Sequence, residues 1–228
     1  MKRSEINARL QEAVAFLDSQ NFHLPKWAYW SPQDWKAAGD EADEVRKCML
    51  GWDLTDFGKG DYDACGLLLF TIRNGRPDVA QAGGKDYCEK MLLIGEDQLT
   101  PTHFHWAKME DIINRGGGNL VLKLWNADPD SEQKLDTPVT VSIDGIERTY
   151  DAGAEVVLEP GESITLPPFM YHLFYAEKGA GPVLGGEVSR VNDDANDNRF
   201  AEPLPRFPQI EEDAEPVYLL CTEYPEAN

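Results

Sequence analysis

The first sixty residues show apolar positions at helical spacing, whereas most of the remaining chain shows the pattern of strands. Ile6, Leu10, Val14 and Leu17 recur every three or four residues after Ser4, a residue type that caps helix N-termini well. The spacing predicts an amphipathic helix that buries one face.

A second helix is predicted to begin at Ser31-Pro32. Ser31 suits the N-cap, and Pro32 suits the first helical position, where its missing N–H is not needed. Asp34 follows where a negative charge favours the helix dipole. The helix should continue through residues 40–50 with an interruption near Gly39. Because the apolar faces of these helices need a partner surface, we expect them to pack on the outside of the strand-rich remainder of the chain.

From about residue 64 the pattern becomes that of short β-strands separated by Gly, Pro, Asn and Asp. The predicted strands are residues 64–76, 86–94, 100–107, 119–126, 139–143, 146–150, 155–160, 163–168, 172–177, 183–191 and 217–223. Many short strands with frequent turn signals indicate a β-sandwich or barrel. Residues 192–216 form the one long segment without periodicity, which is typical of a functional loop or a surface wrap.

A chain of 228 residues can form one all-β unit. We therefore predict a single domain over residues 1–228. Within it, residues 1–60 form an N-terminal helical segment, and residues 61–228 form a β-barrel with a C-terminal extension.

The formal net charge is −20, which opposes binding to nucleic acid or to anionic membranes. Solubility alone could explain this charge, and a neutral or cationic small molecule, or a metal cation, remains compatible with it. No apolar stretch is long enough for a membrane span, and the N-terminus lacks the pattern of a secretory signal. The four cysteines are widely spaced and are expected to stay reduced, so we predict a cytoplasmic protein.

Two histidines stand one residue apart in "PTHFHWAKME", residues 101–110. Alternation along a strand places His103 and His105 on the same face. Glu110 has the opposite parity, so a bulge or tight bend is needed to bring it to that face. Each histidine taken alone could equally be a core or surface imidazole.

His172 follows a Pro167-Pro168 break and opens a strand that could lie beside the strand with the histidine pair. Three imidazoles and one carboxylate would then converge, and this donor set suits first-row divalent metals. His103, His105, Glu110 and His172 are therefore the predicted metal ligands. The fourth histidine, His23, is predicted to be structural.

Two segments carry a resemblance to the cupin superfamily. Gly95, His103, His105, Glu110 and Gly116 resemble its first motif, and "GESITLPPFMYH", residues 161–172, resembles its second. The chain departs from these motifs in a longer spacing after Gly95 and in Phe169 and Ala176, which replace the usual glycine and asparagine. The fold that the resemblance implies is an all-β cupin, a double-stranded β-helix or jelly-roll barrel, with N-terminal α-helices packed on it.

Longer stretches resemble the D-lyxose isomerases of that superfamily. These stretches are "PTHFHWAKMEDIINRGGGNL", "LPPFMYHLFY" and "GEVSRVNDDANDNRF", together with the helical start. The resemblance implies a Mn²⁺-dependent aldose–ketose isomerase. It would act on D-lyxose and D-xylulose, with D-mannose and D-fructose as a related pair, and a homodimer is also implied.

Such an isomerase needs proton carriers near the metal. Lys90 lies on a strand face with mainly apolar neighbours, where burial would favour its neutral form, and the resemblance also places a catalytic lysine on this strand. Glu187 follows two glycines that permit close approach of a ligand. Lys90 could instead be a lysine whose stem covers apolar surface, and Glu187 a surface carboxylate.

Asp194 and Arg199 are candidates for binding sugar hydroxyls, although a solvated acidic turn would explain them equally well. No role is assigned to the nearby aromatic residues Phe104, Trp106, Phe169, Tyr171 and Phe174. Two other functions stay open: a metal-dependent cupin dioxygenase with the same three-His-one-Glu site, and a non-catalytic sugar-binding cupin.

Overall fold

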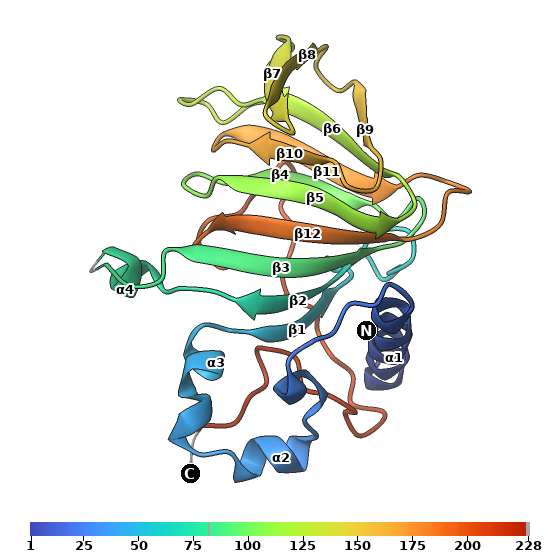
Figure 1. Ribbon diagram of the computed structural model, residues 1–228, viewed down its shortest axis with the longest axis vertical. Coiled ribbons are helices and arrows are strands. Elements are labelled where there is room, and N and C mark those ends of the chain that lie inside the picture. Colours follow the sequence, from blue (N-terminus) through green and yellow to red (C-terminus); the bar gives the residue numbers. More distant parts are fainter. Residues whose placement is uncertain (82, 227–228) are drawn as a thin grey trace.

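A computed structural model describes residues 1–81 and 83–226 and shows two antiparallel sheets with helices packed on one of them (Figure 1). The larger sheet has the strand order β1-β2-β3-β12-β5-β10-β7-β8, and the smaller has the order β13-β4-β11-β6-β9. The predicted all-β barrel with helices on its outside is confirmed.

The larger sheet contains β1 (Gly51–Thr55), β2 (Leu67–Arg73), β3 (Tyr87–Ile94), β5 (Glu110–Gly117), β7 (Val139–Ile143), β8 (Ile146–Tyr150), β10 (Ser163–Leu166) and β12 (Val183–Arg190). The smaller sheet contains β4 (Thr100–Phe104), β6 (Leu120–Asn126), β9 (Glu155–Leu158), β11 (Met170–Ala176) and β13 (Arg199–Phe200). The helices are α1 (Arg3–Ser19), η1 (Lys26–Tyr29), α2 (Pro32–Ala37), η2 (Asp40–Ala42), α3 (Asp43–Lys47) and α4 (Pro77–Gln81).

The main core fills the space between the two sheets, because alternate residues of each strand point inward. Ile112, Leu122, Leu124 and Ile164 are each at most 2% exposed there. A second core lies on the opposite face of the larger sheet, where Leu10 of α1 packs with buried residues of β1, β2 and β3. The sheet is therefore buried on both faces at its helical end, as Figure 1 shows with α1 beside the lower strands.

The N-terminal predictions hold with small shifts of boundary. The first helix begins at Arg3 and not after Ser4, and it buries Ile6, Leu10 and Leu17 as predicted. Ser31 caps α2 through a capping box with Asp34. The chain is interrupted near Gly39, where η2 and α3 replace a continuous helix.

Two differences concern the ends of the larger sheet. Residues 51–55 fall within the segment predicted to be helical, yet they form the edge strand β1. The strand predicted at residues 217–223 is wrong, because this part contributes only an isolated bridge from Leu220 to Trp52. Its apolar residues contact β1 and the helices instead of extending the sheet.

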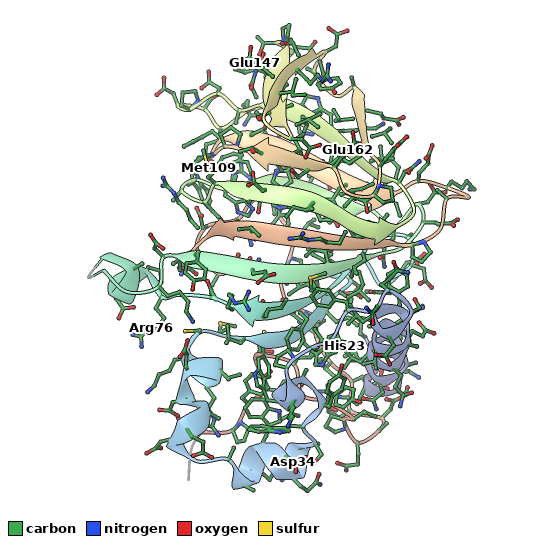
Figure 2. All side chains as sticks on the ribbon, viewed as in Figure 1. His23, Asp34, Arg76, Met109, Glu147 and Glu162 are labelled. Carbon is green, nitrogen blue, oxygen red and sulfur yellow. The ribbon has the colours of Figure 1, made fainter. Side chains whose placement is uncertain are left out.

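No helix in the described part of the chain has both the length and the apolar character that crossing a bilayer requires. The four cysteines are free thiols. Figure 2 shows charged side chains around the whole outline, including Glu147 on the β7–β8 hairpin and Glu162 beside β10, in keeping with the strongly negative net charge.

Candidate metal centre and active site

Pairing between β4 and β11 brings three histidines together inside the barrel. His103 of β4 lies directly opposite His172 of β11, and their ring centroids are 4.2 Å apart. His105, the residue after β4, has its ring centroid 5.2 Å from that of His103. The candidate ligand nitrogens of these histidines all lie within 4.8 Å of one another, so one ion could reach all three.

Glu110 reaches the same point from the other sheet. The chain leaves β4 at Phe104, turns through residues 105–109 and enters β5 at Glu110. The Oε1 atom of Glu110 lies 3.4 Å from His105 Nε2 and 3.2 Å from His172 Nε2. The tight bend required by the parity of Glu110 is therefore a turn between strands of different sheets.

Backbone carbonyls fix the orientation of each imidazole. His103 Nδ1 lies 2.8 Å from the Pro101 carbonyl, His105 Nδ1 2.7 Å from the Asp197 carbonyl, and His172 Nδ1 3.0 Å from the Met170 carbonyl. Because a carbonyl oxygen only accepts hydrogen bonds, each Nδ1 carries the proton and each Nε2 keeps a free lone pair. Burial and the neighbouring imidazoles also lower the pKa of His103 well below its ordinary value, which favours the neutral form that binds metals.

The carboxylate of Glu110 lacks one partner in this arrangement. Its Oε1 is buried and accepts no hydrogen bond, although it faces the lone pairs of two imidazoles. Such an unpaired buried anion is costly unless a cation lies between it and the nitrogens. Three imidazole nitrogens and one carboxylate oxygen fit a first-row divalent cation.

A row of alternating charges continues from Glu110 into the cavity. Lys108 Nζ lies 2.8 Å from Glu110 Oε2 and 2.9 Å from Glu187 Oε1. Glu187 of β12 is opposite Lys90 of β3, whose Nζ is 3.3 Å from the same Oε1 and 3.7 Å from Asp194 Oδ1. All these side chains are at least four-fifths buried, so their charges interact with little screening by solvent.

The lysines hold Glu187 in its ionised form. Burial raises the pKa of Glu187, but the charges of Lys108 and Lys90 more than offset this, and the pKa is lowered from its ordinary value. For Lys108, burial lowers the pKa, but the charges of Glu110 and Glu187 more than offset this. The pKa of Lys108 is therefore raised above its ordinary value. Glu187 is therefore a charged carboxylate at neutral pH and is available to accept a proton.

The row of charges ends at Arg206. Its Nη2 donates to Asp194 Oδ2 at 2.8 Å and to Asp53 Oδ2 at 2.6 Å. Its Nη1 is buried and has no partner, although the side chain lines the same cavity as the histidines. An unpaired donor at this place could bind a hydroxyl oxygen of a ligand.

The cavity is lined by both polar and apolar side chains, a combination that suits a small polyhydroxylated molecule. Its lining consists of Phe57, Leu67, Leu69, Lys90, Leu92, Thr100, His103, His105, Lys108, Glu110, Ile112, His172, Phe174, Glu187, Asp194, Asn198, Phe200 and Arg206.

Comparison with known proteins identifies the family. A family model described as D-lyxose isomerase matches residues 1–224. The chain belongs to the D-lyxose isomerase family. Within that family, the D-lyxose/D-mannose isomerase of Serratia proteamaculans is 51% identical over 98% of each chain. The protein with the same name from Escherichia coli O157:H7 is 49% identical with the same coverage.

Solved structures support the cupin-type fold of this D-lyxose isomerase family member. The L-ribose isomerase of Acinetobacter sp. DL28 in complex with L-ribose has a TM-score of 0.58 and 16% identity, covering 89% of this chain and 93% of its own. The L-ribose isomerase of Geodermatophilus obscurus has a TM-score of 0.57 at 16% identity, covering 88% and 92%. Identities this low show the fold alone.

The structure brings most of the predicted site residues of this family member to one cavity. His103, His105, Glu110 and His172 form one cluster, and the predicted proton carriers Lys90 and Glu187 lie nearby. The apolar surroundings predicted for Lys90 are only partly right, because its ammonium group lies between carboxylates and also donates to Asn192 Oδ1 at 2.7 Å.

The two predicted sugar-binding residues differ. Asp194 lines the cavity, but Arg199 does not. The Nε of Arg199 donates to Glu132 Oε2 at 2.8 Å, next to the indole of Trp106, which donates to the other oxygen. Its position in β13 therefore directs the guanidinium away from the metal cluster, and the structure does not support a role in sugar binding.

The aromatic residues near the motifs mostly pack elsewhere. Phe104 and Tyr171 form a separate cluster with Trp106 and Phe169, whereas Phe174 lines the cavity. Phe169 has a φ of 60°, which explains why the cupin motif usually has glycine there. Stacking of Phe169 on Phe104, with centroids 5.2 Å apart, offsets part of this strain.

Sequence reasoning missed Lys108 and Arg206 in this family member. Lys108 lies in a turn that reads as solvent-exposed, yet it is only 3% exposed. Its one sequence signal is its place between two predicted metal ligands. Arg206 lies in the long segment without periodicity, where no pattern indicates burial. His23 is exposed and lies beside the helices, so it takes no part in the site (Figure 2).

Proposed function

We propose that this protein is a metal-dependent aldose–ketose isomerase that interconverts D-lyxose and D-xylulose. The observation that carries the proposal is the convergence of three imidazole nitrogens and the unpaired Glu110 oxygen beside a buried, ionised Glu187. The names of the relatives, which are about half identical over nearly the full chain, support the same substrate. They also support D-mannose as a second substrate, and we propose D-fructose as its product.

The reaction moves a proton between C2 and C1 of the open-chain sugar through an enediol. Glu187 is placed to take this proton from one carbon and return it to the other, because it is charged and inside the cavity. Lys90 and Lys108 flank it and can donate hydrogen bonds to the sugar oxygens next to these carbons. Asp194 and the free Nη1 of Arg206 would bind hydroxyl groups farther along the sugar.

His103, His105, Glu110 and His172 would hold the metal, and Mn²⁺ is the ion we propose. When bound, a divalent cation stabilises negative charge on the oxygens of the reacting carbons.

The buried charges agree with this chemistry. With neutral imidazoles, three cations face four nearby carboxylates, so the net charge of the site is −1. The cations are Lys90, Lys108 and Arg206, and the carboxylates are Asp53, Glu110, Glu187 and Asp194. A divalent cation would change this net charge from −1 to +1. A site with a net positive charge complements an enediolate that carries one negative charge.

The two rival functions fit the site less well. A cupin dioxygenase could use the same donor set, but it has no need for a carboxylate between two buried lysines. A sugar-binding cupin without activity would not need the unpaired Glu110 oxygen. A cytoplasmic location, expected from the free cysteines, and a homodimer, implied by the resemblance, remain part of the proposal.

An anaerobic reaction in heavy water tests the proposed function. Protein loaded with Mn²⁺ is incubated with D-lyxose, and D-xylulose with deuterium at C1 is expected. Protein treated with a chelator serves as the control. If the Mn²⁺-loaded protein forms no D-xylulose, the proposal is overturned. If it forms D-xylulose without deuterium, only the claim that the proton on Glu187 exchanges with solvent is overturned.

A further inference from the structure

The turn between β4 and β5 carries groups from both halves of the site. His105 opens the turn, Lys108 lies within it, and Glu110 comes directly after it. Residues 105–109 belong to no strand, and backbone hydrogen bonds hold the two ends of the turn, from the N–H of Phe169 to the His105 carbonyl and from the N–H of Arg190 to the Met109 carbonyl. Figure 2 labels Met109 of this turn beside the start of β5. Another contact must hold the middle of the turn in place.

Asp197 supplies that contact from the segment after β12. Its Oδ1 accepts the N–H of Ala107 at 2.9 Å, and its Oδ2 accepts the N–H of Lys108 at 2.9 Å. Its backbone carbonyl also accepts the Nδ1 hydrogen of His105 at 2.7 Å. One residue thus makes three hydrogen bonds to the turn, from about ninety positions later in the chain.

Each of these bonds constrains a group of the proposed site. The bond to His105 Nδ1 fixes the imidazole plane with Nε2 directed at Glu110. The bond to the Lys108 backbone fixes the origin of the side chain whose Nζ lies between Glu110 and Glu187. Displacing the turn would move both groups together.

We propose that Asp197 is a positioning residue of this site, which sets the placement of His105 and Lys108 without contacting the substrate or the metal. This inference rests on the proposed isomerase function. Asp197 is not among the residues that line the cavity with the histidines, so its effect must pass through the turn.

The chemistry of the contact requires a carboxylate. Two adjacent N–H donors face two oxygens that can only accept. An asparagine of the same size would place an NH₂ group against one of the two donors and lose that bond. Asp193 offers a matched control in the same acidic segment, because both of its carboxylate oxygens accept from the side chain of Asn196 and not from the turn.

The test compares Asp197→Asn with Asp193→Asn in the full-length protein. For Asp197→Asn we expect kcat to fall about 10- to 100-fold and the Kd for Mn²⁺ to rise about tenfold, since partners of metal ligands have effects of this size. KM should change less than about threefold, because the groups that bind the sugar hydroxyls stay in place. Asp193→Asn should match the wild type in all three quantities.

The Kd for Mn²⁺, measured by electron paramagnetic resonance, gives a readout that does not depend on activity. If Asp197→Asn equals Asp193→Asn in both Kd and kcat, the positioning role is overturned. If Asp197→Asn does not fold, Asp197→Glu decides by the same comparison, because it keeps the charge but displaces both acceptors. A wild type that neither binds Mn²⁺ nor forms D-xylulose would overturn the proposed function itself, and this inference with it.

Discussion

Glu187 combines two properties that a residue moving a proton between carbons needs. It is only 5% exposed, so water does not compete for its oxygens, and two lysines keep it ionised. It lies on β12 directly after two glycines, and alternation along that strand directs it into the barrel.

Replacing Glu187 with glutamine should abolish the proton transfer and leave the metal site intact. We expect kcat to fall about 10²- to 10⁴-fold, the usual contribution of a general base. The Kd for Mn²⁺ should stay within about threefold of the wild-type value, because Glu187 does not touch the imidazoles. Steady-state kinetics and metal titration check both expectations.

Glu89→Gln is the matched control, since Glu89 pairs with Arg73 on the outside of the same sheet. Its kcat should equal that of the wild type. Full activity in Glu187→Gln would assign the proton transfer to another group.

His172 is the one proposed ligand that comes from β11. It belongs to the second motif segment, residues 161–172, whereas the other three ligands belong to the first. Replacing His172 with alanine removes one nitrogen donor from the cluster and leaves Glu110 with fewer partners. We expect the Kd for Mn²⁺ to rise at least about tenfold, with activity lost at the metal concentration that saturates the wild type. Metal content after dialysis, measured by mass spectrometry, checks this.

His23→Ala serves as the comparison for His172→Ala, because His23 is exposed and lies outside the cluster. It should retain the metal. Equal metal content in the two variants would contradict the proposed ligand set.

At the scale of elements, the sequence predicted most strands of the two sheets but missed the central strand β5 and the edge strand β1. The β4–β11 pair could be predicted because His-x-His fixes the face of one strand, and the Pro167-Pro168 break fixes the start of the other. The strand at residues 51–55 could not, since it is buried on both faces and shows no alternation. The apolar run at residues 217–223 looked like a strand, but its side chains pack with the helices.

The positions of Lys108, Arg206 and Asp197 could not be predicted either. Each lies in a turn or loop, where no periodicity relates sequence to burial. Their partners are distant in the chain, so only the folded structure brings them together: Arg206 meets Asp53 across 153 positions. The cluster of His103, His105 and His172 could be predicted, because these histidines lie in or directly after strand segments.

Docking of α1 on the larger sheet buries Tyr62, and this burial makes the free energy of unfolding depend on pH. Burial raises the pKa of Tyr62 to about 12 from an ordinary value near 10. Below pH 10 the phenol is neutral in both the folded and unfolded states, so it adds no pH dependence. Between pH 10 and 12 the unfolded chain ionises first, and the free energy of unfolding therefore falls as pH rises.

The Tyr62→Phe variant should lose this decline. We expect the wild type to lose about 2 to 3 kcal/mol more than the variant between pH 10 and 12. Denaturant titrations of both proteins at several pH values measure the difference. Parallel curves for the two proteins would show that Tyr62 ionises equally well in the folded state.

For the whole molecule, the proposed ion would join the two sheets. His103 and His172 belong to the smaller sheet, and Glu110 belongs to the larger one. A ligand that binds only the folded state stabilises it by an amount set by its concentration relative to Kd.

Thermal stability should therefore depend on the metal. At about one thousand times its Kd, Mn²⁺ should add about 4 kcal/mol, which corresponds to a rise in Tm of roughly 10 °C for a chain of this size. Differential scanning calorimetry with and without Mn²⁺ measures the shift. The rise should be smaller in His172→Ala at the same Mn²⁺ concentration, and an equal rise in that variant would place the ion elsewhere.

The two ends of the chain meet at α1. Arg3, only 1% exposed, binds Glu212 at 2.7 Å and also pairs with Glu223, and the amino group of Met1 donates to the Gln209 carbonyl at 2.9 Å. The residues between β12 and this contact include Asp197, which holds the turn between β4 and β5, and Arg206, which lines the cavity.

This arrangement affects how the protein matures during synthesis. A ribosome that has released only the first two hundred residues has produced every strand, yet the pocket still lacks Arg206, and Arg3 still lacks both of its carboxylate partners. The residues after Phe200 thus complete both the cavity and the contact at α1, so a chain that lacked them would contain every strand but no Arg206 guanidinium beside the histidines.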